Sequence, residues 1–190
     1  MAGPVKCVWY DRAPKIKREL RRYAHNRDCP VRLPGRCACC DVFVPFDIIE
    51  WHEPIIAVQE GPPRDDPRWP TECDRCGYKF LETDHWQVFT DAIYRNSETG
   101  QEFFMRELPV GAMYNSHWLP DHHKGPDGMA LTVVLPDRTP WVIDGSAYDN
   151  GRAIPKAWTR TGTIPNISVT PSILTPRYHG WLKAGVLHPC

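Results

Sequence analysis

The chain contains two C-x-x-C cysteine pairs, and this feature constrains its fold more than any other. The pairs are Cys37 and Cys40 in RCACCD, and Cys73 and Cys76 in ECDRCGY. Two thiolates at this spacing reach one ion from a single tight turn, and two such turns complete the tetrahedron that Zn²⁺ prefers. Gly77 after the second pair favours the turn, because glycine adopts positive φ readily. We therefore predict one structural zinc ion bound by Cys37, Cys40, Cys73 and Cys76.

The other cysteines leave alternatives open. Cys39 lies inside the first pair, so Cys37 with Cys39, or Cys39 with Cys40, would also present two thiolates. Two disulfides are the competing interpretation of the pairs, but without a secretion signal a reducing compartment disfavours them. Cys7, Cys29 and Cys190 have no partner at a ligand spacing, and we expect buried or partly buried thiols. An intermolecular disulfide through Cys190 is the alternative.

Composition excludes several classes of protein. The 190 residues carry 23 Lys and Arg against 23 Asp and Glu, which argues against a globally basic coat for nucleic acid. With 20 Pro and 13 Gly, the chain suits short strands joined by turns better than a helical bundle. The start, MAGPVKCVWY, has no apolar signal-peptide core, and no apolar run approaches the ~20 residues of a membrane span. We expect a protein that is neither secreted nor membrane-bound.

One segment is predicted to be helical. Over residues 11–28, Ile16, Leu20 and Tyr23 recur at helical spacing, and Pro14 suits a first turn. The opposite face would then carry a cluster of basic side chains: Lys15, Lys17, Arg18, Arg21 and Arg22. This cluster would meet phosphate or an acidic protein face, although a solvated helix surface is the simpler interpretation.

The rest of the chain reads as β structure. Short strands are expected at 41–46 and 55–59, with a stiff proline-rich loop at 61–72. Hairpins are expected at 86–108, at 131–144 and at 179–188. We therefore predict a mainly β protein with one N-terminal helix (α+β), in which a zinc-ribbon-like module precedes a small β domain of hairpins. The expected segments are 1–36 for the helix and arm, 37–108 for the zinc module and 109–190 for the β domain.

A histidine cluster is the candidate for a second, catalytic metal site. His117, Asp121, His122 and His123 lie close together in the sequence, and His179 would complete an open site in which bound water is activated. Adjacent His122 and His123 would point in opposite directions on a strand, which weakens the case. The sequence lacks H-E-x-x-H, G-x-S-x-G, a P-loop and G-x-G-x-x-G, so we predict that the protein is not an enzyme.

Two segments of the second half carry a family resemblance. They are KGPDGMALTVVLPDRTPWVIDGSA (124–147) and TPSILTPRYHGWLKAGVLH (170–188), marked by Pro171–Ile173, His179–Leu182 and Gly185. Over about residues 107–190 the chain resembles an uncharacterised family of small proteins found in tailed-phage genomes and in bacterial ubiquitin-like operons. Members carry cysteines in the segment that corresponds to 148–170. This chain has none there, so no second metal site is carried over from the family.

Together these features favour a non-enzymatic, zinc-stabilised phage protein. We expect a virion structural or assembly component, present in the virion or the host cytoplasm, that docks onto other protein subunits. Arginine and aromatic residues at turns expected to be exposed suit such docking: Arg64, Arg68, Trp69, Arg177 and Tyr178. The first alternative is a nucleic-acid-binding accessory protein that uses the basic helix 14–27 and the zinc ribbon. The second is a metal-dependent hydrolase that uses His117, His122 and His123.

Overall fold

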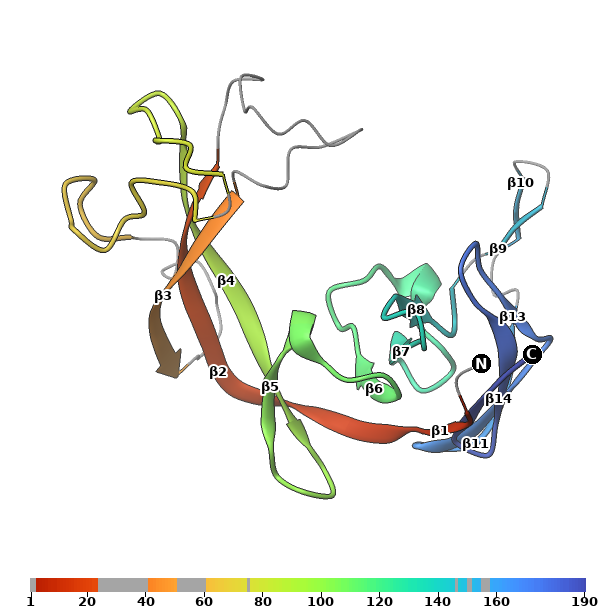
Figure 1. Cartoon of the computed structure of the whole chain (residues 1–190). Coiled ribbons are helices and arrows are strands. Elements are labelled where there is room, and N and C mark those ends of the chain that lie inside the picture. The colour runs from red at the N-terminus through yellow and green to blue at the C-terminus, as the bar shows by residue number, and fades with distance from the viewer. Residues whose placement is uncertain are drawn as a thin grey trace. The chain divides into compact units, whose positions relative to one another are not determined.

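The computed structural model describes residues 3–23, 41–50, 61–74, 76–145, 147–149, 152–154 and 158–190 (Figure 1). The chain forms two compact units, one made of Met1–Arg12 with Tyr94–Cys190 and the other of Ala13–Ile93. These two units do not test the expected segments 1–36, 37–108 and 109–190, which stay a prediction. Among the described residues, no helix is long and apolar enough to cross a membrane.

The first unit is built from short, mostly antiparallel strands around an apolar core. One sheet has the strand order β1 (Val5–Lys6), β15 (Val186–Pro189), β14 (His179–Lys183) and β13 (Ile173–Leu174). In another, β6 (Ala112–Asn115) pairs with β7 (Leu131–Val134), and β7 pairs with β8 (Pro140–Val142). The remaining strands are β5 (Glu102–Phe104), β9 (Ala147–Asp149), β10 (Arg152–Ile154), β11 (Thr159–Thr163) and β12 (Asn166–Thr170). Two 3₁₀ turns, η3 (Met105–Glu107) and η4 (Asp121–His123), complete the unit.

The core of this unit takes alternate side chains from β12 and β14, whereas β7 is buried along its whole length. Met113, Leu131, Val133, Ile173 and Leu182 are fully buried in it. Trp141 meets Trp158 edge to face, with ring centroids 5.0 Å apart. Burial of this apolar cluster is the main stabilising contribution of the unit, because the hydrophobic effect scales with the apolar area removed from water.

A partly buried arginine links β11 to two loops of the same unit. Arg160 of β11 donates from Nε to Asp144 Oδ1 at 3.0 Å and from Nη2 to Asp127 Oδ1 at 2.5 Å. A Cβ at Gly125 would lie 2.1 Å from Arg160 Nη2, so the chain passes the guanidinium at a distance only glycine permits. The pKa of Asp144 is raised because burial disfavours its charged form, an effect that Arg160 only partly offsets.

The second unit is organised around residues 13–23 of β2 (Val8–Tyr23), whose first residues belong to the first unit. β3 (Asp41–Glu50) pairs antiparallel with it from Lys15↔Glu50 to Tyr23↔Asp41, with a register shift between Arg18 and Glu19. β4 (His85–Asn96) neighbours β2 in the sheet order. Residues 61–84 follow as turns and a short cysteine-bearing hairpin.

The expected helix over 11–28 is wrong over residues 11–23, which belong to β2; residues 24–28 lie outside the described chain. Ile16 and Leu20 are both buried, as the helix interpretation required. However, residues four apart share a face in a strand as well as in a helix, so this spacing does not distinguish the two. Nine registered partners in β3 decide the outcome, because tertiary pairing overrides a weak local preference.

The mainly β character expected from the sequence is confirmed, as are three hairpins. β4 and β5 are neighbours across a turn closed by Asn96 N donating to Gln101 O at 2.8 Å. β7 pairs with β8, and β14 with β15. Ala184 and Gly185 have φ of 45° and 74°, as a two-residue hairpin turn requires. The expected strand 41–46 lies within β3, and the expected strand 55–59 falls outside the described residues.

Candidate metal centre

Cys73 and Cys76 lie at the tip of a tight hairpin. Phe80 N donates to Thr71 O at 2.9 Å and Cys73 N to Tyr78 O at 2.8 Å, so the two arms pair in register. Gly77 N then donates back to Cys73 O at 2.8 Å. Gly77 has a φ of 68°, in the left-handed region that glycine adopts without strain. The C-x-x-C-G sequence therefore folds into one turn that carries both thiols.

The first thiol of this turn is buried within a small aromatic and aliphatic cluster. Cys73 is 1% exposed and packs with Phe80, and Tyr78, Cys76 and Val42 cover them. Val42 is in β3, two residues after Cys40. The strand that follows the first cysteine pair thus packs against the second pair. Cys29, Cys37, Cys39 and Cys40 themselves lie outside the described residues.

Cys73 and Cys76 are suited to be two of the four ligands of a zinc ion. Two thiols on one turn supply half of a four-cysteine site, and thiolate is a preferred ligand of Zn²⁺. Within the described ranges, no group of three or more His, Cys, Asp or Glu side chains is placed to hold a metal ion. Any further ligands would come from outside the described ranges, where Cys37 and Cys40 lie.

Arg22 secures the base of the cysteine hairpin. Its Nη1 donates to Pro70 O at 3.0 Å and its Nη2 to Leu81 O at 2.7 Å, the carbonyls just outside the two paired arms. Its Cζ lies 3.6 Å from the centroid of the Trp86 ring and 5.1 Å from that of Phe80. Burial lowers the pKa of Arg22, since the charged form loses hydration there.

Asp84 closes the same hairpin from its C-terminal side. Its Oδ2 accepts from Leu81 N at 2.8 Å and from the Tyr78 hydroxyl at 3.2 Å. Asp84 is buried, so both contacts form away from bulk water. Hydrogen bonds to a buried charged group are among the stronger ones in proteins. Arg22 and Asp84 therefore both fix the arms of the hairpin, Arg22 through backbone carbonyls and Asp84 through a backbone N–H and the Tyr78 hydroxyl.

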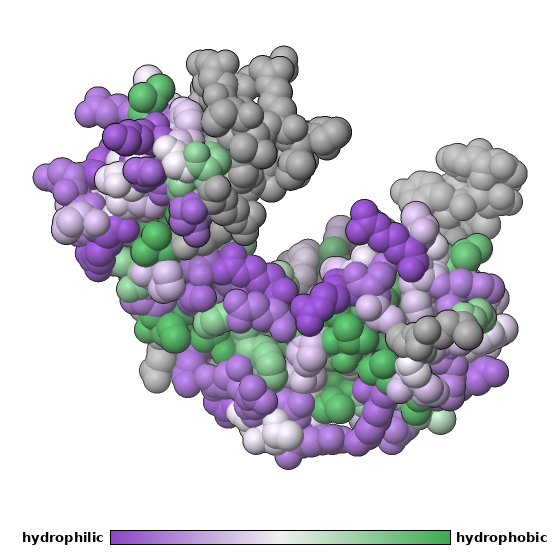
Figure 2. All heavy atoms as spheres, viewed as in Figure 1, coloured by the Kyte–Doolittle hydropathy of each residue, from purple (hydrophilic) through white to green (hydrophobic). Residues whose placement is uncertain are grey.

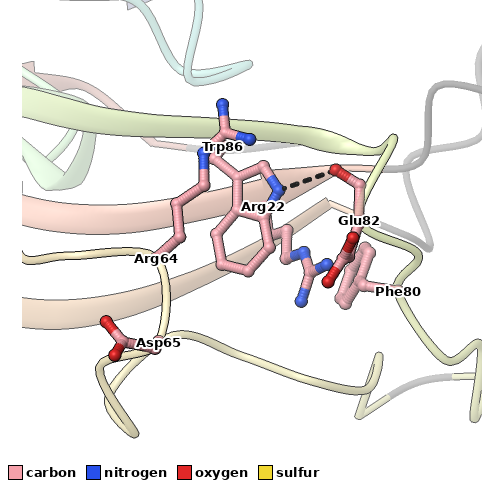
Figure 3. Close-up of a pocket in the computed structure, with 6 residues that line it drawn as sticks. All are labelled: Arg22, Arg64, Asp65, Phe80, Glu82 and Trp86. Carbon is pink, nitrogen blue, oxygen red and sulfur yellow. Dashed lines mark hydrogen bonds between the residues drawn. The ribbon is translucent and has the colours of Figure 1, made fainter.

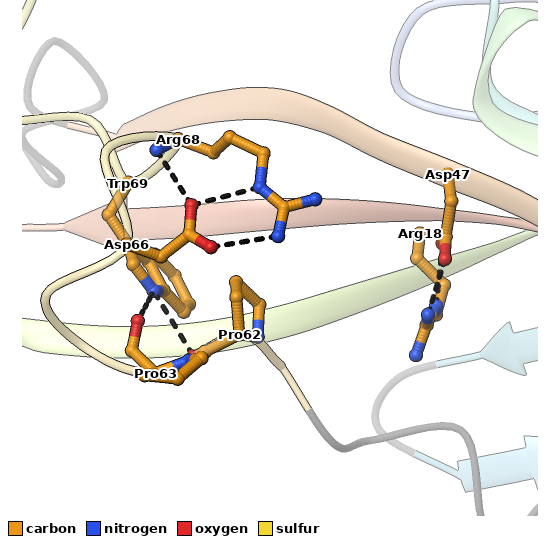
Figure 4. A network of polar contacts seen from close by, with 7 residues as sticks. All are labelled: Arg18, Asp47, Pro62, Pro63, Asp66, Arg68 and Trp69. Atoms are coloured by element: carbon orange, nitrogen blue, oxygen red, sulfur yellow. Dashed lines mark hydrogen bonds and ion pairs between the residues drawn. The ribbon is translucent and has the colours of Figure 1, made fainter.

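The basic residues of the expected helix do not form one open basic face. Arg18 pairs with Asp47 through both carboxylate oxygens (Figure 4). Lys17 Nζ lies 2.8 Å from Glu19 Oε1, and both side chains are largely buried. Arg21 Cζ lies 4.8 Å from the centroid of the Tyr23 ring. Contacts inside the unit thus hold most of the charge that the sequence assigned to a phosphate-binding surface.

The histidine cluster is not assembled into a metal site within the described chain. His122 and His123 are adjacent in η4, with ring centroids 4.2 Å apart. His117 Nε2 lies 2.5 Å from Arg12 Nη1, a position where a cation would compete with a metal ion. His179 belongs to β14 and lines a different pocket with Tyr178 and Cys190.

Some residues expected at exposed turns are buried instead. Trp69 and Tyr178 are 6% exposed, so the expectation that they lie at exposed turns is wrong. Trp69 Nε1 donates to Pro63 O at 2.9 Å (Figure 4). Its ring also meets that of Trp86 in β4 edge to face. Arg64, Arg68 and Arg177 are exposed as expected.

Sequence reasoning missed the Arg22–Trp86 pair. It placed Arg22 on a solvated helix face and Trp86 in an ordinary hairpin strand. The alternation of β2 was the available signal, because Leu20 and Arg22 are two residues apart and therefore share a face. Comparisons with protein-family models, with curated proteins and with solved structures gave no significant match.

Proposed function

We propose that this protein is a non-enzymatic, zinc-stabilised component that docks onto other protein subunits, in the phage setting that the family resemblance implies. The observation that carries the proposal is the cysteine hairpin itself. It presents two thiols on one turn, and Arg22 and Asp84 brace it. A braced hairpin of this kind suits a structural metal and a rigid recognition surface.

The zinc part rests on the second cysteine pair and its neighbour from β3. Val42 packs on the Cys73 cluster and follows Cys40 by two residues in the sequence, which supports a site shared by the two pairs. We propose that Cys37 and Cys40 complete the site. Zinc bound by four thiolates has no open coordination position, and its binding free energy adds to the stability of the fold.

The docking part rests on the kind of side chains beside the hairpin. Arginine and tryptophan are enriched where proteins recognise one another, and Arg22, Arg64 and Trp86 gather in one pocket. In the face that Figure 2 shows, hydrophilic residues cover much of the surface and hydrophobic ones form small groups among them. Such a surface favours a local polar docking site over a broad apolar interface.

The two alternative functions have less support. Binding of nucleic acid needs basic side chains that reach phosphate, but Lys17, Arg18 and Arg22 are engaged inside the fold. A metal-dependent hydrolase needs an open ligand set, and the described histidines do not converge on one.

Two measurements test the proposal on the untagged, full-length chain. Elemental analysis of protein purified without chelator should find one zinc per chain, and the Cys73→Ser variant should lose it and melt at a lower temperature. Cys190→Ser is the matched control, because Cys190 is exposed and its removal should change neither quantity. A Cys73→Ser variant that retains zinc and its melting temperature would contradict the zinc site.

Docking is tested by sedimentation of phage particles or assembly intermediates from infected cells. The chain should sediment with them in a fixed ratio to their other proteins after washing at high ionic strength. Its absence from both fractions would overturn the docking function while leaving the zinc result untouched.

A further inference from the structure

The unit Ala13–Ile93 contains a pocket of about 470 Å³ beside the cysteine hairpin (Figure 3). The side chains around it combine two guanidinium groups, two aromatic rings and two carboxylates: Arg22, Arg64, Asp65, Phe80, Glu82 and Trp86. Trp86 is fixed by its own Nε1 donating to Glu82 O at 3.3 Å. The pocket therefore has a rigid aromatic wall with charges of both signs.

Arg22 places a positive charge at this wall, and no carboxylate of the described chain hydrogen-bonds to it, although Asp84 and Glu82 act on that charge from nearby. The residue is 3% exposed, and its two terminal nitrogens donate to backbone carbonyls rather than to a carboxylate. Among the described residues, its buried Nε has no hydrogen-bond acceptor. A poorly hydrated buried charge that no carboxylate contacts directly is costly, so an anion that enters the pocket gains from Arg22, whose dehydration has already occurred on folding.

Arg64 supplies a second, adjustable guanidinium. Its Cζ lies 5.9 Å from the centroid of the Trp86 ring, and the residue is exposed on the proline-rich loop. An exposed arginine beside an aromatic ring can turn its fork toward a carboxylate and bind both oxygens. Arg22 would then act on the same anion through its charge at short range.

The two carboxylates decide which kind of anion fits. Asp65 and Glu82 make the formal charge of the lining zero, so an extended polyanion such as a nucleic-acid backbone would meet repulsion along with attraction. A single carboxylate on a short side chain would reach the guanidinium groups of Arg22 and Arg64. The carboxylates of Asp65 and Glu82 would then stay hydrated instead of facing it. The charge pattern therefore favours a protein ligand over a polyphosphate.

We propose that this pocket binds an acidic side chain, Glu or Asp, on a loop of another protein subunit. The carboxylate hydrogen-bonds to Arg64 in the field of Arg22, and the methylene stem packs on Trp86. This inference rests on the proposed docking function and gives that function a specific site and a specific partner chemistry.

The test uses the full-length protein and an N-acetylated, C-amidated alanyl-glutamyl-alanine tripeptide as the probe. The indole N–H resonance of Trp86, assigned by its loss in Trp86→Phe, should shift and saturate with this peptide. The glutaminyl analogue, equal in shape but uncharged, should give no such shift. Arg64→Gln should weaken the binding about tenfold, as removal of one charged hydrogen bond does.

Glu82→Gln is the matched control, because it removes a negative charge from the lining where Arg64→Gln removes a positive one. It removes a negative charge from the lining without changing its shape, so the glutamyl peptide should bind at least as tightly as to the unchanged protein, and more tightly at low salt. Equal binding of the two peptides, or equal affinity in Arg64→Gln, would overturn the proposal. So would a thymidine decamer that binds at Trp86 more tightly than the glutamyl peptide.

The failures of the two proposals are distinguishable. If the chain sediments with particles but the glutamyl peptide does not bind, docking uses another surface and only the pocket assignment fails. If the peptide binds and the chain is absent from particles and intermediates, the docking function in that setting fails and the pocket assignment stands.

Discussion

The guanidinium Cζ of Arg22 lies 3.6 Å from the centroid of the Trp86 ring. This contact joins two strands, since Arg22 belongs to β2 and Trp86 to β4. It also directs the two terminal nitrogens at Pro70 O and Leu81 O. One side chain therefore ties the sheet of the second unit to both arms of the cysteine hairpin.

Replacement of Arg22 should destabilise this unit strongly. Arg22→Met keeps the length of the stem but removes two charged hydrogen bonds and the stacked cation, and it leaves two partly buried carbonyls without donors. We expect a loss of about 2–4 kcal/mol in the free energy of unfolding. Urea titration followed by Trp fluorescence measures it.

Arg64→Met is the matched control for that experiment. Arg64 is exposed, and a surface substitution of this kind should change the free energy of unfolding by no more than about 0.5 kcal/mol. If the two variants unfold at the same urea concentration, Arg22 does not brace the hairpin as described.

The strands and hairpins were largely predictable from the sequence, whereas β2 was not. A short apolar, β-branched run beside Pro and Gly turns, such as Leu131–Val134 of β7, identifies a strand locally. β2 carries Ile16 and Leu20 four residues apart, a spacing common to helix and strand, among charged residues that favour a helix. Pairing with β3, which is distant in sequence, decides its state, and the local pattern of β2 alone is ambiguous.

The candidate site was predictable only in its cysteine chemistry. The spacing of Cys73 and Cys76 with Gly77 predicts the turn that the structure has. The role of Arg22 depends on Trp86, Pro70 and Leu81, which lie 48 to 64 residues further along the chain. A buried cation whose partners are this far away in the sequence is hard to predict, because a charged residue is expected at the surface unless its partners are known.

Gly77 should be intolerant of a branched side chain. Its φ of 68° strains any residue with a Cβ, by about 1–2 kcal/mol, and a β-branched residue fares worst. We expect Gly77→Val to lower the melting temperature and to release zinc faster to a competing chelator. Gly77→Asn should be milder, since Asn adopts the left-handed region more readily.

Gly3→Val is the control for Gly77, because a Cβ at Gly3 meets no atom within 4 Å. Its melting temperature and zinc release should equal those of the unchanged protein. If Gly77→Val behaves as Gly3→Val does, the positive φ of Gly77 is not a requirement of the cysteine turn.

Asp66 should remain ionised to unusually low pH. It accepts from Arg68 N, Nε and Nη2 at 2.9, 2.9 and 2.8 Å, and these bonds, the side-chain ones foremost, lower its pKa from 3.8 to about 2 (Figure 4). The folded pKa is below the unfolded one, so the contact stabilises the fold above pH 3.8 and is lost as the pH falls toward about 2.

A carboxyl NMR titration of Asp66 measures this shift directly. In Arg68→Gln the midpoint should rise toward 3.8, because the charged side-chain donor is gone while the backbone donor remains. An Asp66 midpoint that is the same with and without Arg68 would show that the loop contact does not persist in solution.

Cys7 and Cys190 should differ sharply in their reactivity toward iodoacetamide. Burial raises the pKa of the Cys7 thiol to about 12, against a smaller opposing effect of the Leu187 backbone, and the residue is 1% exposed. The thiolate is the reactive form, so Cys7 should resist alkylation near neutral pH until the protein unfolds. Cys190 is exposed and should react readily in the folded protein.

Peptide mapping by mass spectrometry over a time course, with Cys190→Ser to remove the fast reaction, separates the two thiols. Alkylation of Cys7 in the folded protein at the rate of Cys190 would contradict its place in the core.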